Sequence, residues 1–301
     1  MSAYLIILSL VVVGRLLARH FPATAPETLN QIVIVFCLPA LIFIHVPELE
    51  ASLALLPLIA VPWLLWLVSV VIVLVLARWM NFRREAVAVL LLLLPLGNTS
   101  FLGFPITEAL LGEQSVGYAV VYDQFGSFVL LCTHALFVVA WYSTGQRPAW
   151  RDIAGRIISF PPFIALVAAI VLGNAWFPDW LMALTHSFAD MLLPLVTLAI
   201  GMSLHLRLIH DYRRPLYIGL LFKLLVLPAV ALVAIMMMNA RPDVARAALL
   251  EASMPSMITA AALLSSARLA PPLASAMVAW GVLLSALTVP LWYYIGQMLL
   301  T

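Results

Sequence analysis

The sequence predicts an all-α polytopic membrane protein with ten transmembrane helices, arranged as two inverted repeats of five helices. The first observation is composition: of 301 residues, 65% are hydrophobic and only 9% are charged, which is too few charges to cover a water-soluble domain. The second is that apolar runs of spanning length recur along the whole chain. The third is that polar and helix-breaking residues interrupt the fourth and ninth runs at corresponding places.

A window of about 20 residues separates the apolar runs. They cover residues 3–20, 29–47, 53–79, 85–112, 116–142, 155–175, 180–205, 214–238, 243–267 and 272–299. The first run lacks the basic start and small-residue cleavage site of a secretory signal, so we expect it to be a retained span. Cys37 and Cys132 lie in apolar runs without a CxxC motif, which predicts buried thiols.

Basic residues gather on alternate connections between the runs. These connections contain Arg15 and Arg19; Arg78, Arg83 and Arg84; Arg147, Arg151 and Arg156; Arg207, Arg213 and Arg214; and Arg268. The opposite connections carry only Arg241 and Arg246. Because Lys and Arg accumulate on the cytoplasmic side, we expect both termini to lie outside.

Two segments indicate an internal repeat. FPATAPETLNQIVIVFCLP (21–39) and FPDWLMALTHSFADMLLP (177–194) both start with Phe-Pro and reach Leu-Pro inside the next run. Their offset of about 155 residues also pairs the interrupted fourth run with LLEASMPSMITAAALLSS (249–266). Each half then holds five spans, and an odd number makes the second half inverted relative to the first.

The fourth run contains GNTSFLGFP, which is unfavourable in a continuous helix. Gly97, Gly103 and Pro105 each weaken or remove helical hydrogen bonding, so this span should break into two half-helices. We expect Pro105 in the first turn of the outer half-helix and Pro255 in the same place in the inverted half. The positive ends of two half-helices would then converge at the midplane, where an anion is favoured.

GNTSFLGFP, EASMPS in the ninth run and the ten-span inverted repeat resemble the auxin efflux carrier family, which in bacteria includes permeases for malonate and malate. The resemblance implies a secondary transporter in the bacterial inner membrane that works as an elevator and forms a homodimer. It further implies that residues 1–50 and 153–207 form a scaffold, whereas residues 51–142 and 211–301 form a transport domain whose broken helices cross.

The resemblance also assigns a solute site. The family's crossover asparagine and proline match Asn98 and Pro105, and its second proline matches Pro255. No asparagine lies near Pro255, where Met254, Ser256 and Thr259 take the neighbouring places, so the match does not by itself assign the substrate of the plant carriers. We expect a small organic anion, a mono- or dicarboxylate that is auxin-like or malonate/malate-like. The residues expected to bind it are Asn98, Thr99, Ser100, Gly103, Pro105, Met254, Pro255, Ser256 and Thr259.

Two acidic residues lie at similar depth within spans, Asp123 in VVYDQFGSF and Glu251 in EASM. Buried charges are costly unless they are paired or hydrated, so both are candidates for binding a coupling ion together with Ser253. That ion is a proton or sodium: EASM resembles the segment by which bile-acid symporters hold sodium through a glutamate, which matches Glu251. Alternatively, each acid caps backbone amides at a helix break.

For four other polar residues within spans, the sequence allows two interpretations each. Lys223 either extends toward the cytoplasm or is attracted by a carboxylate. His186 and Asp190, one turn apart, either line the pathway or pair with each other. His134 satisfies a backbone carbonyl or takes part in the pathway.

Other function classes fit less well. Tyr122-Asp123 resembles an intramembrane aspartyl protease motif, but the GxGD partner, HExxH and GxSxG are missing, so we expect no enzyme. We expect no cofactor beyond a coupling sodium ion and no nucleic-acid partner; the partners are the solute, the ion and the lipid bilayer. A channel fits two broken helices less well than alternating access does, and a sensor with a transporter fold remains the alternative.

Overall fold

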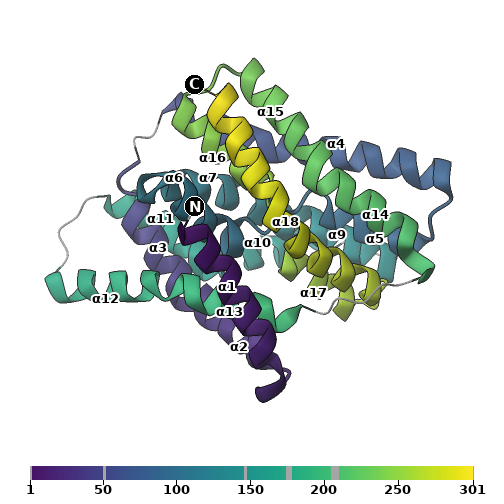
Figure 1. Ribbon diagram of the computed structural model, residues 1–301, viewed down its shortest axis with the longest axis horizontal. Coiled ribbons are helices and arrows are strands. Elements are labelled where there is room, and N and C mark those ends of the chain that lie inside the picture. Colours follow the sequence, from purple (N-terminus) through teal and green to yellow (C-terminus); the bar gives the residue numbers. More distant parts are fainter. Residues whose placement is uncertain (1, 50–51, 146–147, 174–177, 205–209, 301) are drawn as a thin grey trace.

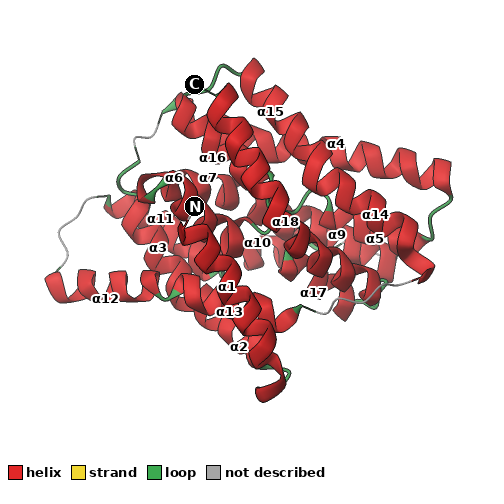
Figure 2. Ribbon diagram, in the orientation of Figure 1, coloured by secondary structure: helices red, strands yellow, loops and turns green. Residues whose placement is uncertain are grey.

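The computed structural model describes residues 2–49, 52–145, 148–173, 178–204 and 210–300 (Figure 1). Arg147, Phe177 and Arg207, which the sequence analysis used, lie outside the described residues. Within the described part of the chain the secondary structure is helical, without strands, as Figure 2 shows, and one isolated antiparallel bridge joins Gly97 to Ser256. The prediction of an all-α protein is therefore confirmed.

The first half of the chain contains α1 (Ser2–Leu17), α2 (Ala25–Ile32), α3 (Leu38–His45), α4 (Leu56–Met80), α5 (Arg84–Leu93), α6 (Phe104–Leu111), α7 (Val116–Tyr122), α8 (Phe128–Leu130) and α9 (Leu136–Ser143). The second half contains α10 (Trp150–Ile158), α11 (Pro161–Leu172), α12 (Asp179–Asp190), α13 (Leu192–Ser203), α14 (Arg213–Leu221), α15 (Leu227–Met237), α16 (Pro242–Ala252), α17 (Ile258–Ser266) and α18 (Pro271–Leu299). Several neighbours, such as α2 and α3, are joined by five-residue π-helical turns and run on as one helix.

Six helical segments of the described chain are long and apolar enough to cross a bilayer. They are 25–45, 53–80, 113–143, 179–203, 210–237 and 271–299; α10 and α11, bent by 63°, make a seventh if they count as one span. The predicted runs at 3–20, 85–112 and 243–267 correspond to shorter helices: α1 with 16 residues, and the pairs α5/α6 and α16/α17, each interrupted in the middle.

The helices form two groups. In the first group, α1 and α2 pack against α13, and α3 packs against α11 and α12. The α1–α13 contact is close because Gly14 and Gly201 have no side chain: a Cβ on Gly14 would overlap the Leu198 carbonyl, and one on Gly201 would overlap the Val11 carbonyl. In the second group, α16 packs against α4, α7, α15 and α18, and α5 packs against α4, α9 and α17. The first group occupies the lower left of Figure 1 and the second the upper right.

The outer surface of the molecule is apolar, as a lipid-facing surface must be. Exposed aliphatic side chains follow one another along α1, α4 and α11, for example Leu5 and Leu16, Leu74 and Val75, and Ile170. Exposed tryptophans lie at helix ends, where aromatic side chains meet the membrane–water interface: Trp79, Trp150 and Trp180. This surface, together with the six spans, identifies an integral membrane protein.

Candidate functional site

The first helix break lies between α5 and α6. α5 ends at Leu93, just before Pro95, and helical backbone resumes as a π-helical turn at Thr99–Gly103 that runs on into α6. Pro105 lies in the first turn of α6, as predicted. The helix nevertheless starts earlier than the proline, because the Asn98 carbonyl accepts hydrogen bonds from the amides of Leu102 and Gly103 at 3.2 and 3.0 Å.

The second break lies between α16 and α17. α16 ends at Ala252 and α17 begins at Ile258, with Met257 as its N-cap residue. Pro255 therefore lies in the non-helical segment before α17, and the prediction that it occupies the first turn of the half-helix is wrong. The physical reason is that the Pro255 carbonyl is used by the other break, where it accepts the Asn98 amide at 2.8 Å.

The two breaks cross and pair through their backbones. Beside the bond from Asn98 to Pro255, the Met257 amide donates to the Leu96 carbonyl at 3.0 Å, on either side of the Gly97–Ser256 bridge. This short antiparallel pairing supplies partners for backbone groups that would otherwise be unsatisfied inside the membrane. We call residues 94–98 and 253–257 the crossing.

Side chains from other segments form hydrogen bonds with the free carbonyls at the C-terminal end of α5. Pro95 has no N–H to give to the Leu91 carbonyl four residues earlier, and His134 Nε2 lies 2.9 Å from that oxygen instead. Ser256 Oγ donates to the Leu93 carbonyl at 2.9 Å, and Lys223 Nζ donates to the Leu94 carbonyl at 3.0 Å. The interpretation of His134 as a residue that satisfies a carbonyl is thus confirmed.

Lys223 follows neither of its predicted interpretations. Its side chain is 3% exposed, so it does not extend to the aqueous phase, and its ammonium group binds a carbonyl and not a carboxylate. A half-helix that ends inside the protein leaves its last carbonyls free, and these carry the negative end of the helix dipole, which attracts a cation. A Cβ placed on Gly97 would be 3.4 Å from Lys223 Nζ, so the positive charge lies directly beside the crossing.

The positive ends of two helices also meet at the crossing. The helical turn at Thr99 and the helix α17 both begin there, and neither has a side-chain hydrogen bond that caps its N-terminus. Their first amides therefore remain available to an acceptor. Asn98, between them, is 3% exposed, and its amide nitrogen Nδ2 has no hydrogen-bond partner among the residues that the structure describes. The crossing thus presents hydrogen-bond donors without acceptors.

Asp123 lies beside the first helix start, on the π-helical turn Asp123–Ser127 that follows α7. Its Oδ1 accepts hydrogen bonds from the Thr99 and Ser100 hydroxyls at 2.5 and 2.7 Å, and its Oδ2 accepts one from Gln124 Nε2 at 2.8 Å. The carboxyl group is 2% exposed. It is held by side chains, and not by the backbone amides that the alternative interpretation requires.

Glu251 lies in the last turn of α16 and is 1% exposed. Its Oε1 accepts a hydrogen bond from the Thr107 hydroxyl at 2.8 Å, whereas its Oε2 has no hydrogen-bond partner in the described part of the chain. Gly103 makes room for this carboxylate, because a Cβ there would overlap it. The third residue of the predicted ion site, Ser253, donates its hydroxyl to the Leu250 carbonyl at 2.6 Å. Asp123 and Glu251 share no hydrogen-bond partner among the described residues.

A small cavity of about 50 Å³ opens at the crossing. Its polar lining consists of Asn98, Ser100, Asp123 and Thr259, and its apolar lining includes Met257 and three phenylalanines, Phe101, Phe128 and Phe160. Ile34 and Leu38 complete it from the first helix group. The volume suits one or two water molecules and not a dicarboxylate, so a solute of that size needs the two helix groups to separate slightly.

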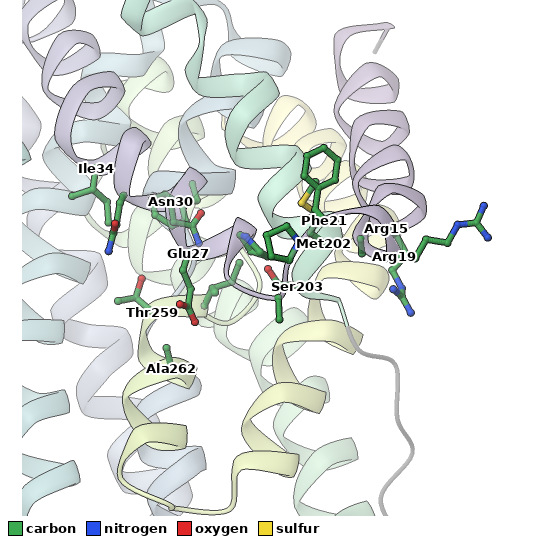
Figure 3. Close-up of a pocket in the computed structure, with 17 residues that line it drawn as sticks. Arg15, Arg19, Phe21, Glu27, Asn30, Ile34, Met202, Ser203, Thr259 and Ala262 are labelled. Carbon is green, nitrogen blue, oxygen red and sulfur yellow. The ribbon is translucent and has the colours of Figure 1, made fainter.

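A larger cavity of about 730 Å³, the vestibule, adjoins the small one, and the two share Ile34, Phe101 and Thr259 as lining residues. The vestibule lies between α1, α2 and α13 of the first group and α17 of the second. In Figure 3, Glu27, Asn30 and Thr259 gather on one side of it, and Arg15 and Arg19 lie on the other. The vestibule thus extends from the arginine-bearing surface toward the crossing and has polar side chains on both sides.

The structure divides the predicted site residues into two sets. Asn98, Ser100, Asp123 and Thr259 line the small cavity, and Thr99 binds Asp123. The others do not line either cavity: Ser253, Met254, Pro255 and Ser256 belong to the crossing, Gly103 lies against Glu251, and Pro105 lies in the first turn of α6.

Three polar residues of the site were not predicted: Thr107 donates to Glu251, Gln124 donates to Asp123, and Asn30 lines the vestibule. Gln124 follows Asp123 directly, Thr107 is one of the polar residues of the outer half-helix, and Asn30 interrupts the second apolar run, so each left a signal in the sequence. His186 and Asp190 are not joined by an ion pair in the described part of the chain, and neither lines the two cavities.

Comparison with known proteins adds independent findings. A family model described as "Membrane transport protein" matches residues 1–143 and 151–293. The chain is 26% identical over 268 residues to an uncharacterized transporter of Methanocaldococcus jannaschii, with 85% of each protein covered. It is also 26% identical over 272 residues to an uncharacterized transporter of Methanothermobacter thermautotrophicus, with 88% of this chain and 87% of the relative covered. The matched residues include both helix breaks.

Proposed function

Because the chain belongs to the membrane transport protein family, the family of the auxin efflux carriers that its sequence resembles, we propose that it is a secondary transporter for a small organic anion. It is an integral membrane transporter and not an enzyme. The observation that carries the proposal is the crossing, where two uncapped helix N-termini and the unpartnered Asn98 Nδ2 lie beside a cavity.

The charges around the crossing support an anionic solute. Helix N-termini favour negative charge, and Lys223 adds a cation behind Gly97. Arg15 and Arg19 line the vestibule through which the solute would arrive. In this proposal Asn98, Ser100 and Thr259 contact the carboxylate, Thr99 holds Asp123, and Gly103, Pro105, Met254, Pro255 and Ser256 keep the crossing in shape.

Asp123 in the same cavity is the reason to propose a coupling ion. A carboxylate next to an anionic solute repels it strongly in a poorly hydrated site, unless a cation neutralises the acid. Protonation of Asp123 does so, and so does sodium, a hard cation that prefers carboxylate and hydroxyl oxygens such as those of Thr99 and Ser100. Glu251, with its free Oε2, is the second candidate for the same ion, and Ser253 lies close by in sequence. We keep protons and sodium as alternatives.

For the membrane arrangement we propose ten spans in two inverted halves. α1 has 16 residues and is about 24 Å long at 1.5 Å per residue, which suits a span where the bilayer is locally thin. The pairs α5/α6 and α16/α17 act as broken spans. With the arginine-bearing connections in the cytoplasm, both termini lie outside a bacterial inner membrane.

The two helix groups suggest how alternating access works. We propose that the first group (residues 1–50 and 153–207) is a scaffold that forms a homodimer, and that the second group (51–142 and 211–301) moves against it as an elevator. The vestibule between them opens beside Arg15 and Arg19, which corresponds to an inward-facing state.

Movement of the groups is testable with cysteines on opposite walls of the vestibule, Ser203→Cys on α13 and Ala262→Cys on α17. The native Cys37 and Cys132 are buried and give little background. Saturating solute should change the labelling rate of both cysteines by about twofold or more, because it shifts the population of inward-facing molecules. Gly155→Cys, on an open surface outside the vestibule, is the control. Equal labelling with and without solute would argue against an elevator.

Uptake into proteoliposomes tests the function itself. A panel of radiolabelled mono- and dicarboxylates, supplied with a sodium gradient or a pH gradient, should include at least one that accumulates with saturation and shows counterflow. A channel would give flux without counterflow, and a sensor that retains the transporter fold would give solute binding without flux. Either result would overturn the proposal.

A further inference from the structure

We propose that a second cavity, separate from the vestibule, binds the phosphate group of an anionic membrane lipid. The cavity has a volume of about 490 Å³ and lies where α4 ends and where α5 and α14 begin. Its lining includes Arg83, Ala86, His210, Asp211, Arg213 and Arg214. None of these residues takes part in the crossing.

The cavity is positively charged, and two of its arginines, Arg83 and Arg213, contact neighbouring side chains. Three arginines line it against one aspartate, and within the described part of the chain none of the three forms an ion pair. The Arg83 guanidinium lies 5.9 Å from the ring centre of Tyr212, whose hydroxyl donates to Glu85 at 3.1 Å. Arg213 Nη2 lies 2.6 Å from His210 Nε2. Arginines held in this way suit the oxygens of a phosphate group.

Two helix N-termini reinforce the arginines. α5 begins at Arg84 and α14 at Arg213, and neither has a side-chain hydrogen bond that caps its start. Ala86, in the first turn of α5, is buried and lines the cavity. The free amides of a first helical turn bind phosphate oxygens directly, and the helix dipole favours the negative charge.

The surroundings indicate a lipid as the source of the phosphate. Trp79, at the end of α4, is 80% exposed, which is typical of the membrane–water interface. Leu74 and Val75 on α4 and Leu221 on α14 are exposed apolar side chains in the adjoining membrane-facing surface. A phosphate bound between the helix starts would therefore have apolar surface beside it for acyl chains. Basic pockets between transmembrane helices on the cytoplasmic side bind anionic headgroups in this way.

Native mass spectrometry of the delipidated full-length protein tests the proposal. Phosphatidylglycerol and phosphatidylcholine are added back in equal amounts, and the lipid-bound fraction is measured. Wild type should retain phosphatidylglycerol in preference. The triple variant Arg83→Gln/Arg213→Gln/Arg214→Gln should lose that preference by about tenfold or more, since each arginine near an anionic surface contributes roughly fivefold in affinity. Arg214→Gln alone, at an exposed side chain, gives an intermediate loss and guards against misfolding of the triple variant.

Arg151→Gln is the matched control, because Arg151 is an exposed arginine on the proposed cytoplasmic face that lies over Trp150 and outside the cavity. It should retain phosphatidylglycerol like wild type. Equal retention of both lipids by wild type, or equal phosphatidylglycerol binding by wild type and the triple variant, would overturn the proposal. Displacement of the lipid by millimolar inorganic phosphate would identify a soluble phosphate site and would overturn the lipid as its occupant. None of these results depends on transport activity.

Discussion

The two helix breaks at the crossing look alike in the chain but are stabilised in different ways. At the end of α5, carbonyls are satisfied from a distance, by His134, Ser256 and Lys223. At the end of α16 they are satisfied locally: the Ser253 amide donates to the Leu249 carbonyl, the Ser253 hydroxyl to the Leu250 carbonyl, and the Met254 amide to the Glu251 carbonyl. The carbonyl end of α5 therefore depends on side chains from other segments, whereas the carbonyl end of α16 does not.

The difference extends to charge. The negative end of α5 receives the ammonium group of Lys223, the only lysine in the chain. The negative end of α16 instead carries a carboxylate, Glu251, with one oxygen unpartnered. A carboxylate in the last turn of a helix is unfavourable, and more so when it is buried. The end of α5 thus has a cation beside it, whereas Glu251 at the end of α16 forms no ion pair among the described residues, so we expect a coupling ion to help at the end of α16.

Neutralising the acids should have the largest effect on this comparison. Glu251→Gln and Asp123→Asn remove the groups that the proposed coupling ion neutralises, so net uptake should lose its dependence on that ion's gradient, a fall of about 100-fold or more. Solute exchange should survive in part, because exchange requires no net ion movement. The measurement compares gradient-driven uptake with counterflow in the same proteoliposomes.

Glu108→Gln, in the last turn of α6, is the matched control for that experiment, since Glu108 lines neither cavity. It should keep the wild-type dependence on pH and on sodium. If the Asp123 and Glu251 variants also keep it, the two acids are structural and the coupling proposal is wrong.

The two glycines of the first break, Gly97 and Gly103, predict a smaller and more specific effect. In Gly103→Ala the new methyl group overlaps the Glu251 carboxylate, so the acid must leave Thr107 in a packed interior, at a cost of about 1–3 kcal/mol. In Gly97→Ala the nearest atom, Lys223 Nζ, is 3.4 Å away, and only a small adjustment is needed. Melting temperature and uptake should both fall for Gly103→Ala and stay close to wild type for Gly97→Ala. The reverse order would contradict the account of Glu251.

The same residues show which features of the two breaks can be predicted from the sequence. Gly97, Gly103 and Pro105 predict the first break because their effect on a helix is local. The hydrogen bond from the Asn98 amide to the Pro255 carbonyl was not predictable, since it depends on two segments about 155 residues apart meeting in one register. Without knowledge of this pairing, the sequence analysis placed Pro255 at a helix start, whereas its carbonyl accepts the Asn98 amide at the crossing.

Two prolines in the sequence explain why two backbone carbonyls need a side-chain donor, but they do not show which side chain supplies it. Pro95 leaves the Leu91 carbonyl free for His134, and Pro228 likewise leaves the Leu224 carbonyl free for Trp292 Nε1, at 2.8 Å. A proline predicts a free carbonyl four residues earlier, but which donor reaches it depends on packing. For Lys223, both sequence interpretations considered water or carboxylates and neither considered a helix end.

Substitution of Lys223 should have the smallest of the expected effects on solute binding. Lys223→Met leaves the Leu94 carbonyl without its donor and removes the cation beside Gly97, which should destabilise the protein by about 1–3 kcal/mol and weaken solute affinity several-fold. Lys223→Arg keeps the charge and should recover most of the affinity, if not all of the stability. Thermal unfolding and solute titration separate the two effects. Equal affinity in Lys223→Met and wild type would remove Lys223 from the electrostatic account.

In the proposed function the crossing binds the anion through Asn98, and calorimetric titration of a transported carboxylate measures that binding without a transport assay. A lost hydrogen bond to a charged group costs roughly 1.5–3 kcal/mol, so Asn98→Ala should bind the carboxylate about ten- to a hundredfold more weakly than wild type. Asn239→Gly, at an asparagine of positive φ outside both cavities, should bind it with wild-type affinity. Wild-type affinity in a folded Asn98→Ala protein would contradict the assignment of the solute site to the crossing.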